Sequence, residues 1–302
     1  MTLNRAAGTV LAAAAVLCGG ATACTSSGGD GKAGSSPRTA AAAAVRKATE
    51  NGERLTSFGY RMTGEVPGSG RIDGEAAISV KPMAMRMRMT SPDQGSDGTL
   101  DMRVTGGALY MGGGRSAAKE TDGRSWLKFD ISGSAAQEAA ATNPLAGQVN
   151  QNPAEQVTFL NGSKDLERVG EETVEGEQTA HYKGTVTLDQ MRESYQDEDA
   201  ATRRRRDQNL SVYEGLGVDK LVVDLWVDQD DRTKRFRTRG AADKGRFDMT
   251  MTFFDYDKPV TVRAPAAEDV VDLAQMMKGA TSSRASGRGS ARADLPETDP
   301  VT

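Results

Sequence analysis

The feature that most constrains this chain is an alternation of apolar and polar residues that runs, broken only by turns, from residue 58 to residue 131. It is clearest in KPMAMRMRMTSP, residues 81–92, where methionine occupies every second position. Side chains two residues apart in a β-strand point to the same face of a sheet, so this period predicts strands with one apolar face. In the methionine segment the opposite face would carry Ala84, Arg86 and Arg88.

The same period defines six predicted strands in this region. Their apolar positions are Phe58, Tyr60 and Met62; Ile72, Gly74, Ala76, Ile78 and Val80; Met83, Met85, Met87 and Met89; Leu100, Met102 and Val104; Leu109 and Met111; and Leu127, Phe129 and Ile131. Turn-forming sequences such as PGSG and SPDQGSDG separate them. Short turns between alternating segments indicate an antiparallel meander and not a series of βαβ units.

Helical patterns interrupt the strands at four places. They cover residues 39–55, two segments within 134–162, a long charged segment at 187–217 and a closing segment at 264–277. Further strand patterns occupy residues 166–188, 220–232, 234–240 and 246–262, with a hairpin turn expected at Glu175 and Gly176. This order predicts an α+β domain whose antiparallel sheet curls and gathers its helices on one face.

The N-terminal segment has the three parts of a secretory signal sequence. Arg5 precedes an apolar run from Ala6 to Leu17, and small residues lead up to Cys24. The run is too short for a membrane span, which needs about 20 apolar residues. The sequence ATAC resembles a bacterial lipobox, in which the cysteine receives a diacylglycerol, although Ala21 stands where leucine is usual. A plain secreted protein cut before Cys24 is the alternative, but it would expose a lone thiol in an oxidising compartment.

These features divide the chain into four parts. We expect a signal peptide at 1–23, a flexible Gly- and Ser-rich tether at 24–39, one ligand-binding domain at 40–277 and a disordered tail at 278–302. Of the two cysteines, Cys18 would leave with the signal, so no disulfide could form. The formal net charge of −4 gives no reason to expect nucleic-acid binding.

The last third of the domain resembles a known family. The segments DLWVDQDDRTKRFR, residues 224–237, and DMTMTFFDYDKPVTVRAPAAEDVVDL, residues 248–273, are similar to the closing pattern of the mycobacterial LppX and LprG lipoproteins, which have the LolA fold. The resemblance implies a half-barrel sheet wrapped around helices, with an apolar cavity that holds the acyl chains of lipids in transit across the cell envelope. It carries over no catalytic residue.

The methionines allow three interpretations. They could simply face the core, as most apolar stripes do. They could form a deformable cavity wall, because methionine is flexible and fills irregular space. They could bind Cu(I) through their sulfurs, although His181, the only histidine, lies in a distant predicted strand. The predicted ligand-binding residues are Met83, Met85, Met87, Met89, Met102, Met249, Met251 and Phe253.

Other polar groups do not form a recognisable catalytic or metal site in the sequence. His181 has no cysteine or second histidine to join it, which favours an ordinary strand position. Asp228, Asp230 and Asp231 lack the glycine and glutamate of a calcium loop, so a charged hairpin turn is expected. The basic run 203–206 follows an acidic segment, as on a solvated helix face, although it could also touch anionic headgroups.

The sequence therefore predicts a monomeric binding protein, not an enzyme, with no cofactor or metal. It would sit on the extracytoplasmic face of the cell membrane through a lipid on Cys24 and hold a lipid or other apolar ligand, with an envelope transport partner. The alternative is a structural or regulatory envelope lipoprotein that recognises a protein partner. A carrier should have a pocket beside Met85 and Met87, whereas an interaction module should have a filled interior.

Overall fold

A computed structural model describes residues 36–112, 123–132 and 153–272. Several predicted features lie outside these residues. They are the signal peptide, Cys24 and most of the tether, residues 134–152 of the helical region expected within 134–162, and the C-terminal tail.

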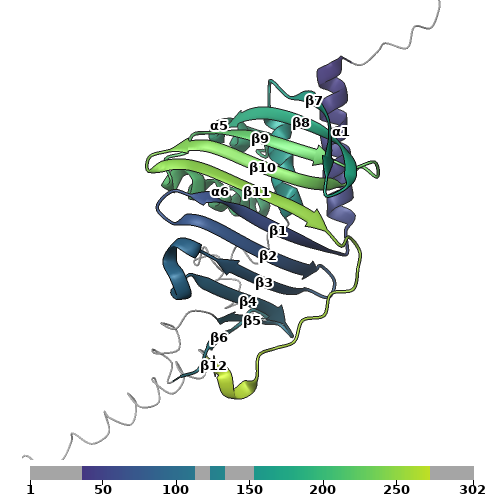
Figure 1. The fold of residues 1–302 in the computed structure, drawn as a ribbon. Helices are drawn as coiled ribbons and strands as arrows, with labels where there is room; N and C mark the ends of the chain where they lie inside the picture. Colours follow the sequence, from purple (N-terminus) through teal and green to yellow (C-terminus); the bar gives the residue numbers. More distant parts are fainter. Residues whose placement is uncertain (1–35, 113–122, 133–152, 273–302) are drawn as a thin grey trace, which may run out of the picture. The chain divides into compact units, whose positions relative to one another are not determined.

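The described residues form a twelve-stranded sheet whose strand order is β12-β6-β5-β4-β3-β2-β1-β11-β10-β9-β8-β7. The strands are β1 (Ser57–Val66), β2 (Gly70–Ser79), β3 (Ala84–Thr90), β4 (Thr99–Thr105), β5 (Ala108–Gly112), β6 (Trp126–Asp130), β7 (Glu167–Val174), β8 (Glu177–Thr187), β9 (Lys220–Val227), β10 (Thr233–Ala242), β11 (Gly245–Phe254) and β12 (Val270–Asp272). The sheet twists and curves and does not close on itself (Figure 1). Every described pair is antiparallel except β12 with β6. The predicted α+β class with a curved antiparallel sheet is confirmed.

The described residues include three α-helices, each with a side-chain cap at its start, and three 3-10 turns. They are α1 (Pro37–Arg54), α5 (Leu188–Ser194) and α6 (Ala200–Gly215), with 3-10 turns η1 (Pro92–Asp97), η2 (Pro153–Gly162) and η3 (Ala267–Asp269). Ser36 caps α1 ahead of a proline at its first position, and Thr187 forms a capping box with Gln190 at the start of α5. Among the described residues, no helix is both long enough and apolar enough to cross a membrane.

Two predicted helices differ from those observed. The single helix expected at 187–217 is two helices, because Asp199 accepts hydrogen bonds from the backbone N–H groups of Ala201 and Thr202 and so starts a new helix. The closing helix expected at 264–277 is wrong over its described part. Residues 267–269 form η3, and Val270–Asp272 then pair in parallel with β6. The β-branched Val270 and Val271 favour this strand.

The segment between β11 and η3, residues 255–266, runs along one end of strands β1 to β5 and is called the strap (Figure 1). Asp257 anchors its beginning, since its carboxylate accepts hydrogen bonds from the backbone N–H and the hydroxyl of Thr56, each 2.8 Å long. Further on, the carbonyl of Val262 accepts from the Thr105 hydroxyl at 3.3 Å. The strap therefore carries the chain from β11 past β1 to β5 to the edge of the sheet that β12 forms.

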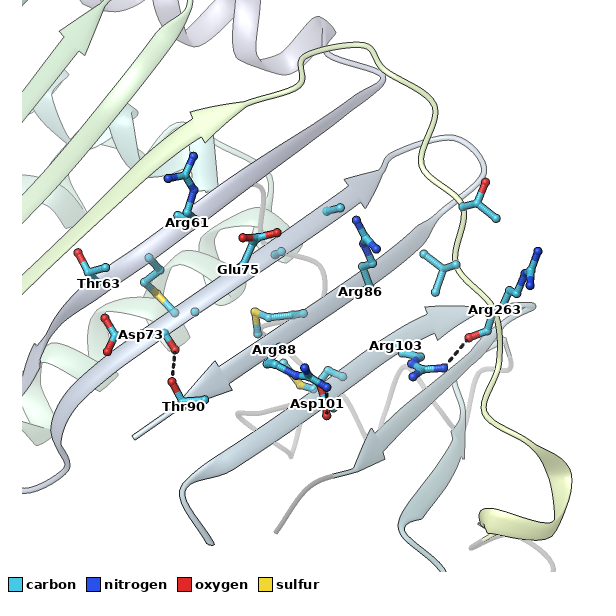
Figure 2. Close-up of a pocket in the computed structure, with 18 residues that line it drawn as sticks. Arg61, Thr63, Asp73, Glu75, Arg86, Arg88, Thr90, Asp101, Arg103 and Arg263 are labelled. Atoms are coloured by element: carbon cyan, nitrogen blue, oxygen red, sulfur yellow. Dashed lines mark hydrogen bonds and ion pairs between the residues drawn. The ribbon is translucent and has the colours of Figure 1, made fainter. Parts of the chain in front are cut away.

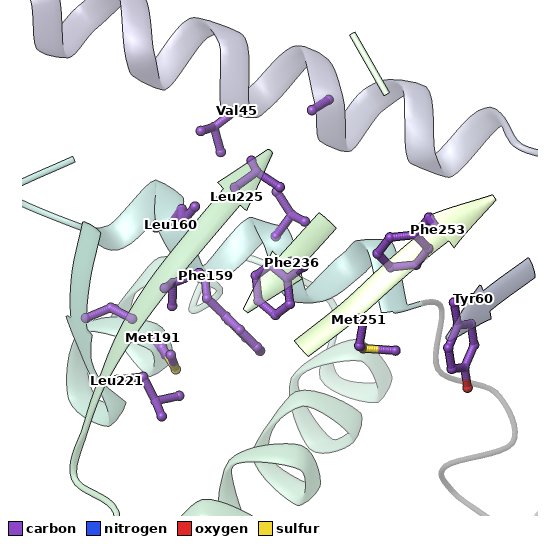
Figure 3. Close-up of a cluster of buried hydrophobic side chains, with 14 of the residues drawn as sticks. Val45, Tyr60, Phe159, Leu160, Met191, Leu221, Leu225, Phe236, Met251 and Phe253 are labelled. Carbon is purple, nitrogen blue, oxygen red and sulfur yellow. The ribbon is translucent and has the colours of Figure 1, made fainter. Parts of the chain in front are cut away.

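The core lies between the helices and one face of the sheet, which we call the inner face. Val45 of α1, Leu160 of η2 and Met191 of α5 meet Leu225 of β9 and Phe236 of β10 there (Figure 3). Each of these five side chains is at most 1% exposed. Burial of a side chain of this size stabilises the fold by about 1.5–3 kcal/mol, so this part of the core contributes strongly to stability.

Candidate ligand-binding site

Strand β3 carries the methionine segment, and its alternation is realised as predicted. Met85 is buried, Met87 and Met89 are half-buried, and Arg86 and Arg88 are exposed on the opposite, outer face. Met83 is the exception. It lies in the turn before β3 and is 41% exposed, because the strand begins only at Ala84, after a proline that cannot donate to the ladder.

Small residues on β2 allow side chains of β1 and β3 to approach each other across it on the inner face. Gly74 lies between Met62 and Met89, and a Cβ at Gly74 would come within 3.1 Å of the Met89 side chain. One step along, Ala76 lies between Tyr60 and Met87. The same rows continue through β4, where Leu100 faces Met89 and Met102 faces Met87. The sequence pattern thus produces a continuous sulfur-rich surface over β1 to β4.

Strand β11 joins this surface on the other side of β1. Met251 pairs with Met62, and Phe253 pairs with Tyr60, whose ring centroid lies 6.1 Å from that of Phe253 (Figure 3). Met249 lies opposite Gly64. The structure therefore brings together the predicted inner-face residues of β3, β4 and β11, which the sequence separates by more than a hundred positions.

These residues divide by burial. Met85, Met102, Met251 and Phe253 belong to the closed core, with at most 7% of each side chain exposed. Met62, Met87, Met111 and Met249 are half-buried and pack against that core. Met89, Leu100, Leu127 and Phe129 are also half-buried on the same side of β3 to β6. An incompletely covered apolar surface therefore extends from the core along the inner face of β1 to β6.

The described helices lie over only part of the sheet. Close contacts join α1 to β7 and β10, α5 to β8, and η2 to β8, and η2 also packs against α1 and α5. In Figure 1, α5 and α6 lie behind strands β8 to β11. The described helices contact strands β7, β8 and β10, and every half-buried methionine except Met249 lies on β1 to β5.

The outer face of β1 to β4 carries a groove of about 940 Å³ (Figure 2). Its charged lining is Arg61, Asp73, Glu75, Arg86, Arg88, Asp101, Arg103 and Arg263, the last contributed by the strap. Thr63, Thr90 and the strap residues Thr261 and Val262 add polar and backbone groups. Sequence reasoning placed Arg86 and Arg88 on this face and missed the groove, because neither the strap's path nor the register of β3 against β4 follows from periodicity.

Ion pairs orient part of the groove. Arg88 donates to both carboxylate oxygens of Asp101, with Nε–Oδ1 and Nη2–Oδ2 distances of 2.8 and 3.1 Å. This bond to Asp101 raises the pKa of the Arg88 guanidinium above its ordinary value. Arg61 bridges to Glu175 at 3.2 Å and lies over the ring of Phe254. Arg88 and Arg61 are therefore already neutralised by the protein.

His181 belongs to a separate cluster on the outer face of β8 and β9. Its ring stacks on Trp226, with centroids 4.3 Å apart, and its Nε2 lies 3.0 Å from Asp224 Oδ1. Its Nδ1 lies 2.8 Å from a Glu172 oxygen, but the geometry is not that of a hydrogen bond. The predicted strand position is confirmed, and the cluster shows that this histidine has a structural setting that the sequence did not indicate.

The other polar candidates have structural surroundings as well. Asp228 begins the β9–β10 turn and accepts hydrogen bonds from the backbone N–H groups of Asp230 and Arg232, so the expected charged turn is confirmed. In the basic run, Arg206 pairs with Glu198 at 2.8 Å. Within the described ranges, no group of three or more His, Cys, Asp or Glu side chains is placed to hold a metal ion.

The described residues thus define an α+β protein with an open sheet, an apolar inner surface and a charged outer groove. No family model matches the sequence. It is 29% identical over 245 residues to an uncharacterized 31.2 kDa protein of Streptomyces griseus, covering 80% of this chain and 78% of that protein. It is 26% identical over 239 residues to a Streptomyces coelicolor protein named as a putative lipoprotein, covering 72% and 73%.

Solved structures with a similar arrangement include two mycobacterial proteins. Lipoprotein LppX of Mycobacterium tuberculosis is 16% identical with a TM-score of 0.46, over 74% of this chain and 98% of LppX. LprF of Mycobacterium bovis is 14% identical with a TM-score of 0.46, over 77% and 100%. A LolA superfamily protein of Nitrosomonas europaea is 10% identical with a TM-score of 0.24, over 74% and 94%.

Proposed function

We propose that this chain is an extracytoplasmic lipoprotein, anchored to the membrane through Cys24, that binds a lipid or another apolar ligand. The ligand lies on the inner face of β1 to β6. The observation that carries this proposal is the row of half-buried apolar side chains that continues the core beyond the described helices, with Met62, Met87 and Met89 at its centre.

The chemistry of that row suits an acyl chain. Methionine side chains are unbranched and polarizable, so they can repack around chains of different length and shape. Each buried CH₂ group is worth about 0.8 kcal/mol, so one long chain supplies substantial affinity without any polar contact. The absence of a reactive cluster among the described residues is compatible with binding by burial.

Two observations support the anchor. The residues before Cys24 have the small side chains of a lipobox, and the related Streptomyces coelicolor protein is named as a lipoprotein. The anchor is tested by feeding cells a labelled fatty acid. Label should enter the natural chain and be absent from Cys24→Ser, which should also pass from the membrane fraction to the soluble one. Equal labelling of both would overturn the anchor and leave the ligand site untouched.

The ligand site is tested with the Cys24→Ser chain by native mass spectrometry and by organic extraction of the purified protein. A co-purifying lipid, or uptake of a fluorescent fatty acid, is expected. Met87→Asp should reduce uptake, because a carboxylate would then face the acyl chain. Arg88→Asp, on the other face of the same strand, should leave it unchanged.

Met89→Ser offers a milder test if Met87→Asp does not fold, since it shortens a half-buried side chain on the same surface. Circular dichroism and the unfolding midpoint identify variants that keep the fold. No lipid in repeated extractions and no uptake by the folded protein would overturn the carrier and favour a protein partner on this face. Equal losses in Met87→Asp and Arg88→Asp would mean that the ligand does not contact the inner face.

A further inference from the structure

The outer groove contains a repulsive pair of arginines that the protein itself does not neutralise. Arg86 of β3 lies directly opposite Arg103 of β4 in the antiparallel register. Like charges at such positions are destabilising. Arg103 is held in place, because its Nη1 donates to the carbonyl of Arg263 at 3.1 Å and its guanidinium lies 4.5 Å from the centroid of the Trp126 ring. These contacts fix the guanidinium between the strap and β6, on the side of β4 away from β3.

The excess positive charge gathers at one end of the groove. Arg86 and Arg263 are exposed, and neither side chain has a hydrogen-bond or ion-pair partner among the described residues. Toward the other end of the groove, acidic side chains offset the positive charge. Arg88 is bound by Asp101, and Glu75 lies between Arg61 and Arg88 in the strand register. Figure 2 shows Arg86, Arg103 and Arg263 together where the strap passes the sheet. An anion placed there would relieve the repulsion.

We propose that this end of the groove binds a phosphate group. Guanidinium groups donate pairs of hydrogen bonds that match phosphate oxygens, and they remain charged at any physiological pH. Arg86, Arg103 and Arg263 come from two strands and the strap and line the same groove, so they can supply donors to the oxygens of one phosphate group. A planar carboxylate, with two oxygens, would satisfy fewer of these donors.

The rest of the groove indicates that the phosphate belongs to a larger, hydroxylated molecule. The volume of about 940 Å³ is far more than a bare phosphate needs. Asp73 and Glu75 form no ion pair among the described residues, and with the hydroxyls of Thr63 and Thr90 they can bond to ligand hydroxyl groups. A phosphorylated polyol, either a soluble sugar phosphate or the headgroup of a phospholipid, has this chemistry.

This site lies on the opposite face of the sheet from the methionine surface. Arg86 and Arg88 alternate with Met85, Met87 and Met89 along the same strand. A phosphate held at Arg86 is therefore separated by the sheet from an acyl chain held at Met87. The two sites can be tested independently, and the failure of one does not decide the other.

Titration calorimetry of the full chain tests the proposal with inorganic phosphate, glucose 6-phosphate and glucose, and sedimentation tests it with phosphatidylglycerol and phosphatidylcholine vesicles. Glucose 6-phosphate should bind more tightly than inorganic phosphate, and glucose should not bind. Binding should weaken as salt is added. Binding to phosphatidylglycerol vesicles without binding of the soluble probes would identify the headgroup as the source of the phosphate.

The decisive variant is Arg86→Gln, because it removes a charge without breaking any described contact. It should weaken phosphate binding about tenfold or more, as expected for loss of a charged hydrogen bond. The matched control is Arg71→Gln on the outer face of β2, where Arg71 pairs with Asp93 at 3.4 Å outside the groove. This control should change binding by less than about threefold.

The unfolding midpoint separates a binding role from a structural one. Without ligand, Arg86→Gln should unfold at the same temperature as the natural chain or higher, because the repulsion with Arg103 is removed. A lower midpoint together with lost binding would make Arg86 a structural residue and overturn the proposal. No binding of any phosphorylated probe by the natural chain, or equal losses in Arg86→Gln and Arg71→Gln, would also overturn it.

Discussion

The hydroxyl of Tyr60 donates a hydrogen bond to the sulfur of Met87 at 3.3 Å. The two residues lie on β1 and β3, and the bond passes over Ala76 of the strand between them. It links the closed core, to which Tyr60 belongs, with the half-buried methionine surface. The boundary between the closed core and the methionine surface therefore depends on the small side chain of Ala76 and on the Met87 sulfur, which is a weak hydrogen-bond acceptor.

Removing the Tyr60 hydroxyl should reduce the alkaline sensitivity of the protein. Burial raises the pKa of Tyr60 to about 12. The unfolded chain ionises near pH 10, so the contribution of Tyr60 to stability is complete below that pH and is lost as the pH rises toward 12. Tyr60→Phe should therefore flatten the fall in urea-unfolding free energy between pH 9.5 and 11.5. Tyr110→Phe is the control. The same slope in Tyr60→Phe and in the natural chain would contradict the prediction.

Met83 and Met85 should respond differently to the same truncation. Met85 is 4% exposed and Met83 is 41% exposed. Met85→Ala should cost about 2–5 kcal/mol of unfolding free energy, because it leaves a cavity in the core. Met83→Ala should stay within about 0.5 kcal/mol. Denaturant titration measures both, and similar costs would show that the strand begins before Ala84.

His181→Ala should destabilise the protein. The substitution removes the partner of Asp224, which is 3% exposed, and the stacking surface of Trp226. Loss of a buried charged hydrogen bond costs about 2 kcal/mol. Lys183→Ala, on an exposed position of the same strand, should be close to neutral. Arg239 also donates a hydrogen bond to the Asp224 carboxylate. A neutral His181→Ala in the same thermal-unfolding assay would mean that Arg239 alone satisfies Asp224.

Asp248 should contribute to stability only above acidic pH. Arg237 donates to both of its oxygens, at 2.8 and 2.7 Å, and Arg246 donates to one at 2.7 Å. The hydrogen bond from Arg237 is the main cause of a pKa below the ordinary value of this carboxyl. A lowered pKa stabilises the fold above the unfolded value of about 3.9, and the effect is lost as the pH falls. In thermal unfolding, Asp248→Asn should reduce the acid-dependent loss, and Asp243→Asn should not.

Much of the fold could be predicted because apolar and polar residues alternate along the strands. The positions of β1 to β6, the turn at Glu175 and Gly176, and the first helix all follow from alternation, glycine placement and capping. Local signals failed where a tertiary contact decided the outcome. Residues 270–272 have both helical and strand character, and pairing with β6 selects the strand. The break before α6 could have been read from Asp199, a preferred capping residue.

The candidate sites divide in the same way. The inner methionine surface was predictable, because it needs only the pleat of a strand and residues of one kind. Its division into closed core and half-buried surface was not, because it depends on packing between elements that are distant in the sequence. The outer groove was missed because it needs Arg86 beside Arg103 and the strap across both, and these are long-range relationships that no local pattern contains.

The strap gives the two ends of the described chain different resistance to pulling. The first described helix is embedded in the core, whereas β12 is joined to the sheet by three paired residues at the end of the strap. Force applied beyond residue 272 would strip β12 from β6 and extend the strap before any strand from β1 to β11 moved. A load at the carboxyl end would therefore detach the elements one after another. The same load at the amino end would act on a helix that is packed into the core.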